Sequence, residues 1–260
     1  MTTDKQQGRL YLVGIGPGDP ELMTCKAVRI LEQTAIWVAP KAKKNGASSA
    51  VQIASGQVEL DGKTVLELCF PMKKIYLGKE QDPEVMLRWR EAAELVLTHL
   101  DRGDDVAFPT LGDPALYSTA FYLLATLQEL RPELRVSIIP GITAMAACSA
   151  RVCSPLGLGD DVVSIVPAAF EDERLREILL TFDAVVLMKV FRKLPRIIAL
   201  LDELGLTDKA VLIERCGMDD QKVYTDIREA LDRDLHYFTT LLVRKKQVGG
   251  HAEAQRRKDF

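Results

Sequence analysis

Two short segments of the sequence combine closely spaced glycines with an Asp-Pro pair: residues 14–20 (GIGPGDP) and residues 110–114 (TLGDP). Glycine adopts positive φ angles without steric cost and lets a ligand approach the main chain closely. Asp accepts hydrogen bonds from the first free N–H groups of a helix, and Pro fits the first helical position. Each segment therefore predicts a loop that joins a strand to a capped helix and binds a small ligand. An Asp-Pro pair without glycines, such as Asp82-Pro83, predicts only a helix cap.

The spacing of the first loop narrows the choice of ligand. Its glycines follow the pattern G-x-G-x-G, whereas dinucleotide-binding loops have G-x-G-x-x-G with an acidic residue after the second strand. Here the second expected strand ends in Ala39-Pro40-Lys41, which has no acid. This disfavours NAD and also the commonest Rossmann-type methyltransferase arrangement. The sequence has no G-x-x-x-x-G-K-[ST] pattern, which excludes a P-loop.

Short apolar runs alternate with segments of helical periodicity, which predicts an α/β fold. In the first half, strands are expected at residues 10–13, 35–39, 106–108 and 136–139, and helices near 23–31, 85–100 and 116–127. In the second half, strands are expected near 162–166, 184–188, 210–214 and 237–243, and helices near 173–181 and 195–204. Both glycine loops then lie at the carboxyl ends of strands, where open α/β sheets bind ligands.

The pattern predicts two domains and a tail. Residues 1–140 form an N-terminal α/β domain with a mostly parallel sheet, flanking helices and both glycine loops. Residues 141–248 form a C-terminal α/β domain, and residues 249–260 are a polar tail.

Composition restricts the class of protein. The 260 residues are 47% hydrophobic and 27% charged with a net charge of −3, as in an ordinary soluble domain. General nucleic-acid binders are usually basic, so nucleic acid is not an expected partner. We find no apolar run that could cross a membrane and no secretion signal in the first ten residues, so we expect a cytoplasmic protein. Five widely spaced cysteines without C-x-x-C, and three histidines, predict free thiols and no metal site.

Five motifs in a fixed order resemble those of the tetrapyrrole methylase family: GIGPGDPELMT, TLGDPALYST, PGITAMAACSA, LMK and ERCG. The resemblance covers residues 9 to about 245. It implies transfer of a methyl group from S-adenosylmethionine, and two α/β domains, the second with a mixed sheet, that form a cofactor cleft in a homodimer. The segment TLGDPALYST is similar to family members that methylate C20 of precorrin-2 or cobalt-factor II in cobalamin biosynthesis. Uroporphyrinogen methylases usually have a double glycine before Asp-Pro, where this chain has Leu111-Gly112.

The resemblance also implies a set of cofactor-binding residues. The set consists of Pro17, Leu111, Gly112, Asp113, Leu116, Thr143, Ala144 and Met188, together with Cys216 or Gly217. The last position is open because the family often has Glu-Asn-Gly where this chain has Glu214-Arg215-Cys216-Gly217. Taken without the resemblance, Met188 also fits a core position at a strand end, and Thr143 also fits a helix cap.

The implied reaction is an in-line displacement, in which alignment of the reactants alone contributes roughly 7–11 kcal/mol. A protein nucleophile or metal is unnecessary, but one proton must leave the methylated carbon. Tyr224 is the candidate acceptor and Tyr117 a second one, although core packing or substrate contact is the favoured explanation for both tyrosines. The implied substrate carries eight carboxylates, and Lys41, Lys43 and Lys44 follow the second strand. We expect this loop to bind the anionic macrocycle.

Other functions remain open from the sequence. The chain fits another member of the same family, such as a uroporphyrinogen, diphthine or ribosomal RNA methylase, although its acidic balance disfavours RNA. From a different class, it fits a nucleotide-binding regulatory module without catalysis. Methyl transfer to a tetrapyrrole distinguishes the two classes.

Overall fold

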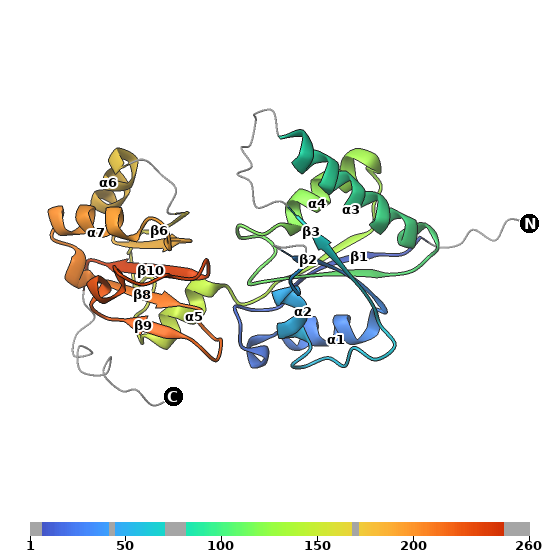
Figure 1. Ribbon diagram of the computed structural model, residues 1–260, viewed down its shortest axis with the longest axis horizontal. Coiled ribbons are helices and arrows are strands. Elements are labelled where there is room, and N and C mark those ends of the chain that lie inside the picture. The colour runs from blue at the N-terminus through green and yellow to red at the C-terminus, as the bar shows by residue number, and fades with distance from the viewer. Residues whose placement is uncertain (1–6, 42–44, 71–81, 168–171, 247–260) are drawn as a thin grey trace, which may run out of the picture. The chain divides into compact units, whose positions relative to one another are not determined.

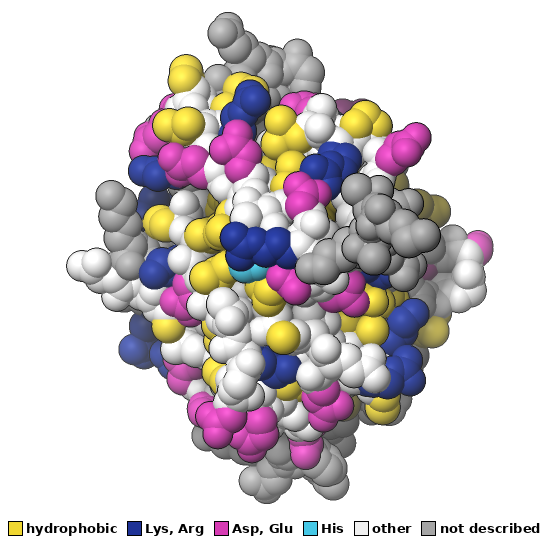
Figure 2. Space-filling view, turned by 90° about the vertical axis from the view of Figure 1, so that its right-hand side faces the viewer, with side chains coloured by type: hydrophobic (Ala, Val, Ile, Leu, Met, Phe, Trp, Pro, Cys, Tyr) yellow, Lys and Arg dark blue, Asp and Glu magenta, His cyan; other side chains and the backbone are white. Residues whose placement is uncertain are grey.

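A computed structural model describes residues 7–41, 45–70, 82–167 and 172–246. The chain forms two compact units, Met1–Thr143 and Ala144–Phe260. Each unit has one five-stranded sheet with helices, so the predicted α/β fold is confirmed. Within the described residues, we find no helix whose length and apolar character would let it span a membrane. On the face shown in Figure 2, Lys and Arg side chains are interspersed with Asp and Glu, in line with 34 basic and 37 acidic residues in the sequence.

The sheet of the first unit is entirely parallel, with strand order β3-β2-β4-β1-β5. Its strands are β1 (Leu10–Gly14), β2 (Ile36–Lys41), β3 (Thr64–Cys69), β4 (Val106–Thr110) and β5 (Val136–Ile139). Its helices are α1 (Cys25–Gln33), α2 (Ser49–Ala54), α3 (Pro83–Asp101) and α4 (Ala120–Leu130). Figure 1 shows α1 and α2 on one face of this sheet and α3 and α4 on the other. Burial on both faces explains why β1 and β4 read as continuous apolar runs in the sequence.

The core of the first unit forms where α3 and α4 pack on the sheet. The apolar positions of α3 recur on one face of the helix, and Trp89 from that face stacks on Phe70 with ring centroids 4.2 Å apart. Asp82 caps this helix by accepting a hydrogen bond from the N–H of Glu84, as its sequence predicts. The register places Leu10 and Leu12 of β1 in the same core, so the ends of the strands are held rigidly.

The second unit has a mixed sheet with strand order β6-β7-β10-β8-β9. Its strands are β6 (Val163–Pro167), β7 (Ala184–Met188), β8 (Ala210–Glu214), β9 (Lys222–Tyr224) and β10 (Thr239–Arg244). Its helices are α5 (Ala144–Arg151), α6 (Asp172–Thr181) and α7 (Leu194–Glu203). Strand β10 is antiparallel to β7 and β8, so its first residues lie beside the last residues of these two strands. Figure 1 shows α6 and α7 on one face of this sheet and α5 on the other.

Four elements do not follow from the sequence patterns: α2, β3, α5 and β9. Helices α2 and α5 have only six and eight residues, too few for a helical period to show clearly. The helix expected near 116–127 begins later than predicted, at Ala120, because residues 114–117 form a turn followed by a bend.

Candidate functional site

Three loops meet at the carboxyl end of the first sheet. They follow β1, β4 and β5 and comprise residues 14–19, 110–119 and 140–143, here called the glycine cluster. Strands β4, β1 and β5 are adjacent and parallel, so their carboxyl ends lie at the same end of the sheet. Gly16 and Gly112 pair directly: the N–H of Gly112 donates to the carbonyl of Gly16 at 2.7 Å, and the reverse bond is 3.3 Å long. The two motifs found in the sequence therefore form one structure.

Glycine is required at the centre of this cluster because the three backbones pack against one another. A Cβ atom at Gly14 would lie 2.7 Å from the carbonyl oxygen of Gly112 and 2.7 Å from the nitrogen of Gly141. A Cβ atom at Gly141 would lie 2.2 Å from the same carbonyl oxygen. These neighbours are all main-chain atoms, which cannot move aside as a side chain can. The centre of the cluster is therefore formed by main-chain atoms.

Asp113 links two of the loops, and this corrects the prediction that it caps the following helix. One carboxylate oxygen accepts from the N–H of Gly141 at 2.9 Å and the other from the N–H of Ala115 at 2.7 Å. Helix α4 begins at Ala120, six residues beyond Pro114, too far for the Asp113 side chain to reach its first N–H groups. The Asp113 carboxylate therefore accepts a hydrogen bond from the N–H of Gly141 instead of from the N–H groups of the helix.

The first loop also departs from the predicted arrangement. Asp19 accepts from the N–H of Glu21 at 2.8 Å and caps only a short 3₁₀ turn, Pro20–Leu22. Helix α1 begins after that turn and is capped by Thr24, which accepts from the N–H of Ala27 at 3.1 Å. The intervening turn leaves Met23, the first residue of the apolar pattern, outside the helix.

Six of the residues expected to bind a cofactor belong to the glycine cluster. Pro17 is buried, whereas the others are half-buried: Leu111, Gly112, Asp113, Leu116 and Thr143. Gly112 has a φ of 66°, and a Cβ atom there would meet nothing closer than 4.0 Å. A small ligand can therefore approach the main chain at Gly112, whereas neighbouring main-chain atoms occupy the space beside Gly14 and Gly141.

Tyr117 lies in the second loop of the cluster in an unusual conformation. Its φ is 51°, and its side chain is 45% exposed. Left-handed backbone in a bulky residue costs energy and occurs preferentially at functional sites. Desolvation raises the pKa of its phenol above the usual value of 10.0, so the group stays protonated at neutral pH. Tyr117 is therefore suited to donate a hydrogen bond rather than to accept a proton.

The other expected cofactor-binding residues belong to the second unit. Met188 ends β7 and is half-buried, and Cys216 and Gly217 follow β8. Both strands flank β10, so these residues lie near the same end of the second sheet. Ala144 is the first residue of α5, the helix that packs on β10.

Cys216 and Cys148 form a buried thiol pair in the second unit. The Cys148 thiol donates a hydrogen bond to the sulfur of Cys216, which raises the pKa of Cys148 and lowers the pKa of Cys216. The positive charge of Arg151 lowers the pKa of Cys216 further. The two cysteines are far apart in the sequence, and no spacing pattern indicates that they meet.

The remaining candidate residues are not part of these loops, or lie outside the described residues. Tyr224 is at the end of β9, 9% exposed, and packs in the hydrophobic core of the second unit. Lys41 ends β2, and its Nζ lies 3.8 Å from a carboxylate oxygen of Glu67. Lys43 and Lys44 lie outside the described residues.

Two residues that the sequence patterns do not single out stand next to expected ones. Lys189 follows Met188 and has a φ of 63°, and Arg215 precedes Cys216 and has a φ of 51°. Sequence reasoning misses them because left-handed backbone is usually signalled by Gly or Asn, not by Lys or Arg.

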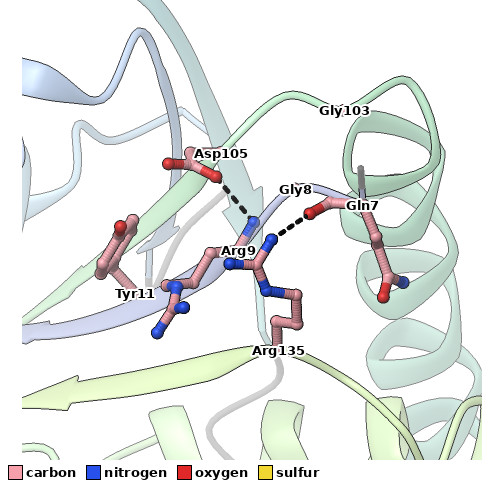
Figure 3. A pocket seen from close by; sticks show the side chains of 7 residues that line it. All are labelled: Gln7, Gly8, Arg9, Tyr11, Gly103, Asp105 and Arg135. Carbon is pink, nitrogen blue, oxygen red and sulfur yellow. Dashed lines mark hydrogen bonds between the residues drawn. The ribbon is translucent and has the colours of Figure 1, made fainter. Parts of the chain in front are cut away.

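A polar concavity of about 490 Å³ lies at the opposite end of the first sheet (Figure 3). The residues that line it are Gln7, Gly8, Arg9, Tyr11, Gly103, Asp105 and Arg135. Its groups satisfy one another: the N–H of Arg9 donates to Asp105 at 2.7 Å, and Arg135 donates to the carbonyl of Gln7 at 2.8 Å. Because these residues precede or begin β1, β4 and β5, the concavity is separated from the glycine cluster by the length of the strands.

Comparison with known proteins places the fold. One relative is a cobalt-precorrin-2 C(20)-methyltransferase from Salmonella typhimurium, which is 33% identical over 92% of this chain and 97% of that protein. Another is a precorrin-2 C(20)-methyltransferase from a Sinorhizobium species, which is 36% identical over 91% of this chain and 95% of that protein. Two solved structures are similar in fold. A cobalt precorrin-4 methyltransferase has a TM-score of 0.69 and 20% identity, covering 91% of this chain and 94% of that one. A uroporphyrin-III C-methyl transferase from Thermus thermophilus, complexed with S-adenosyl homocysteine, has a TM-score of 0.62 and 19% identity, covering 92% of each chain.

The family model for tetrapyrrole (corrin/porphyrin) methylases matches residues 9–231, a span that contains all five motifs and both glycine loops. The resemblance found in the sequence is thereby confirmed, and the chain belongs to the tetrapyrrole (corrin/porphyrin) methylase family.

Proposed function

We propose that this protein is an S-adenosylmethionine-dependent C-methyltransferase that methylates C20 of precorrin-2 or cobalt-factor II in cobalamin biosynthesis. The observation that carries the proposal is the similarity to two C(20)-methyltransferases over more than nine tenths of this chain and of both relatives. The segment TLGDPALYST, which distinguishes this chain from uroporphyrinogen methylases, lies in the glycine cluster.

The glycine cluster fits the methyl donor. When bound, S-adenosylmethionine supplies an electrophilic methyl group on a sulfonium sulfur. The open main chain at Gly112 gives an approach free of side chains, and Asp113 holds the loop to Gly141. We assign donor binding to Pro17, Leu111, Gly112, Asp113, Leu116, Thr143, Ala144, Met188, Cys216 and Gly217. Their task is to hold the donor in one orientation and exclude water, which is how a protein accelerates a displacement without a nucleophile of its own.

Loss of the proton from the methylated carbon needs an acceptor. Tyr224 is our candidate from the sequence, and its burial in the core of the second unit makes a structural contribution the competing explanation. The raised pKa of Tyr117 disfavours it as the acceptor. Tyr224→Phe separates these roles: a lower kcat with unchanged thermal stability supports proton transfer, whereas wild-type kcat excludes it.

Binding of the anionic macrocycle is assigned in part to Lys41, Lys43 and Lys44. Neutralising all three to Gln should raise the KM for the tetrapyrrole and leave the affinity for the donor unchanged. An unchanged KM would exclude a role of these lysines in substrate binding.

The function is tested by incubating the protein with methyl-labelled S-adenosylmethionine and either precorrin-2 or its cobalt form. We expect one label per macrocycle, located at C20 by mass spectrometry and NMR, with one of the two substrates preferred. Transfer to uroporphyrinogen instead would assign another activity of the same family. Tight binding of S-adenosylhomocysteine without transfer to any tetrapyrrole would assign a regulatory nucleotide-binding module.

The assembly and location follow from the same assignment. We expect a homodimer, as the resemblance implies, which light scattering coupled to gel filtration can measure. The five cysteines are free thiols in the structure, which fits a reducing compartment such as the cytoplasm.

A further inference from the structure

Three loops of the second unit are joined by hydrogen bonds at one end of its sheet. They comprise residues 188–193 after β7, 214–217 after β8 and 235–239 before β10, here called the basic-aromatic cluster. The N–H of Lys189 donates to the carbonyl of Thr239 at 3.0 Å, and the N–H of Arg215 donates to the carbonyl of Phe238 at 2.8 Å. The buried carboxylate of Glu214 accepts from the N–H of His236 at 2.6 Å. Main-chain groups and the Glu214 carboxylate therefore fix these loops to one another.

Two aromatic rings form the centre of this cluster, and each has a cation over it. The rings of Phe191 and Tyr237 meet edge to face, with centroids 5.6 Å apart. The Nζ of Lys189 lies 5.3 Å from the centroid of Tyr237, and the guanidinium carbon of Arg192 lies 5.2 Å from that of Phe191. Stacking on a ring limits the conformations of a long cationic side chain and so lowers the entropy lost when an anion binds.

The cations of this cluster differ in their surroundings. Arg215 pairs with Asp220, its Nε lying 2.5 Å from a carboxylate oxygen. Arg192 is exposed and makes no ion pair with a carboxylate in the described part of the chain. Lys189 is half-buried and stands in left-handed backbone, a conformation that the loop contacts must enforce.

We propose that Lys189 and Arg192, supported by Tyr237 and Phe191, bind carboxylate side chains of the tetrapyrrole and so orient the macrocycle. This inference rests on the proposed function, because it takes the substrate to be a flat ring with peripheral carboxylates. Such a ligand has a flat apolar ring and charged carboxylates. The aromatic side chains of the cluster can pack against the ring, and its guanidinium and ammonium groups can bind the carboxylates. The cluster begins at Met188, which we assign to donor binding, so a substrate held here is near a residue of the donor site.

The test is steady-state kinetics with the full-length protein and the variants Lys189→Gln and Arg192→Gln. We expect each substitution to raise the KM for the tetrapyrrole about tenfold, since one charged hydrogen bond contributes roughly this factor. The affinity for S-adenosylhomocysteine, measured by calorimetry, should stay within twofold of wild type. Added salt should raise the KM of the wild-type protein more than that of the double variant, because charge attraction is screened.

The matched control is Lys193→Gln, which removes the same charge from an exposed position of the same loop. Its KM should equal that of the wild-type protein. A KM unchanged in both test variants, or raised equally in the control, would overturn the inference. A parallel loss of S-adenosylhomocysteine affinity would also overturn it, since the residues would then act on donor binding or on folding.

A binding assay separates this inference from the proposed function. Uroporphyrin, an eight-carboxylate macrocycle, is titrated into the wild-type protein and the double variant, and its fluorescence is followed. Weaker binding by the double variant supports the inference even if the wild-type protein methylates neither precorrin-2 nor its cobalt form. Equal binding by the two proteins overturns the inference even if methylation is observed.

Discussion

The glycine cluster and the basic-aromatic cluster occupy comparable places in the two units but are built from different parts of the chain. Both lie at one end of a five-stranded sheet, in loops next to the ends of strands. In the first unit the contacts are between backbones, as in the Gly16–Gly112 pair and the packing of Gly14 on Gly141. In the second unit the backbone is a support for charged and aromatic side chains.

This difference separates two tasks that a methyltransferase must perform. The methyl donor is the same for every member of the family, so a site made of main chain can serve them all. The acceptor differs among members, and side chains can change without altering the fold. We therefore expect substitutions in the glycine cluster to affect donor binding, and substitutions of Lys189 or Arg192 in the basic-aromatic cluster to affect binding of the acceptor.

The largest effect is expected from Gly14→Ala. The new methyl group would overlap main-chain atoms of two neighbouring loops, at 2.7 Å from Gly112 and Gly141, so the loops must separate. We expect a loss of about 3 kcal/mol in the free energy of unfolding, the upper range for overpacking, together with loss of S-adenosylhomocysteine binding. Both tryptophans, Trp37 and Trp89, are in the first unit, so urea unfolding followed by their fluorescence measures this unit.

Gly62→Ala is the control for this measurement. Gly62 is in the same unit with a φ of 76°, and a Cβ atom there would meet nothing within 4 Å. Only backbone strain should affect Gly62→Ala, and we expect it to lower the free energy of unfolding by about 1 kcal/mol. Equal losses in the two variants would show that main-chain packing at Gly14 does not hold the loops together.

A smaller and more selective effect is expected from Gly112→Ala. Its φ of 66° is close to that of Gly62, and its Cβ atom also meets nothing closer than 4.0 Å, so the two variants should lose similar stability. If the donor lies against the main chain at Gly112, the added methyl group blocks it. We expect S-adenosylhomocysteine to bind at least about tenfold more weakly to this variant and normally to Gly62→Ala. Equal affinities would place the donor elsewhere.

The same contrast explains what the sequence can predict. A backbone-built site leaves a strong signal in the amino-acid sequence, because the close packing at Gly14 and Gly141 and the positive φ at Gly112 all favour glycine. The α/β architecture is predictable for a similar reason, because buried parallel strands read as apolar runs. Tertiary partners are not predictable: Asp113 reads as a helix cap but accepts from the N–H of Gly141 instead.

The side-chain site leaves a weaker signal. Lys189 stands in the LMK motif, but neither its left-handed backbone nor its stacking on Tyr237 is encoded by neighbouring residues. Tyr237 lies far along the chain and reaches Lys189 only through the antiparallel pairing of β10 with β7. A single sequence does not reveal that pairing, and the thiol pair of Cys148 and Cys216 is hidden for the same reason.

The smallest effect on function is expected from Asp161→Asn, which tests whether ionic side-chain contacts also stabilise the body of the second unit. The Asp161 side chain is 4% exposed and accepts hydrogen bonds from Arg244 at 2.6 Å, from the N–H of Leu158 at 3.0 Å and from Lys246 at 3.1 Å. The Arg244 guanidinium, followed by the Leu158 N–H and Lys246, holds the pKa of Asp161 at about 2, below its usual value of 3.8. Because the pKa is lower in the folded state, the ionised carboxylate stabilises the fold at neutral pH.

That stabilisation should be fully present above pH 4 and be lost as the pH falls through about 2. At pH 7 we expect the thermal midpoint of Asp161→Asn to lie on the order of 5 °C below that of the wild-type protein, with unchanged S-adenosylhomocysteine affinity. Glu203→Gln, which removes an exposed partner of Arg176, should change the midpoint much less. The difference between Asp161→Asn and wild type, followed by far-UV circular dichroism, should be constant from pH 5 to 8 and shrink below pH 4. A difference that persists unchanged at pH 2.5 would mean that the carboxylate contributes through shape and hydrogen bonding rather than through its charge.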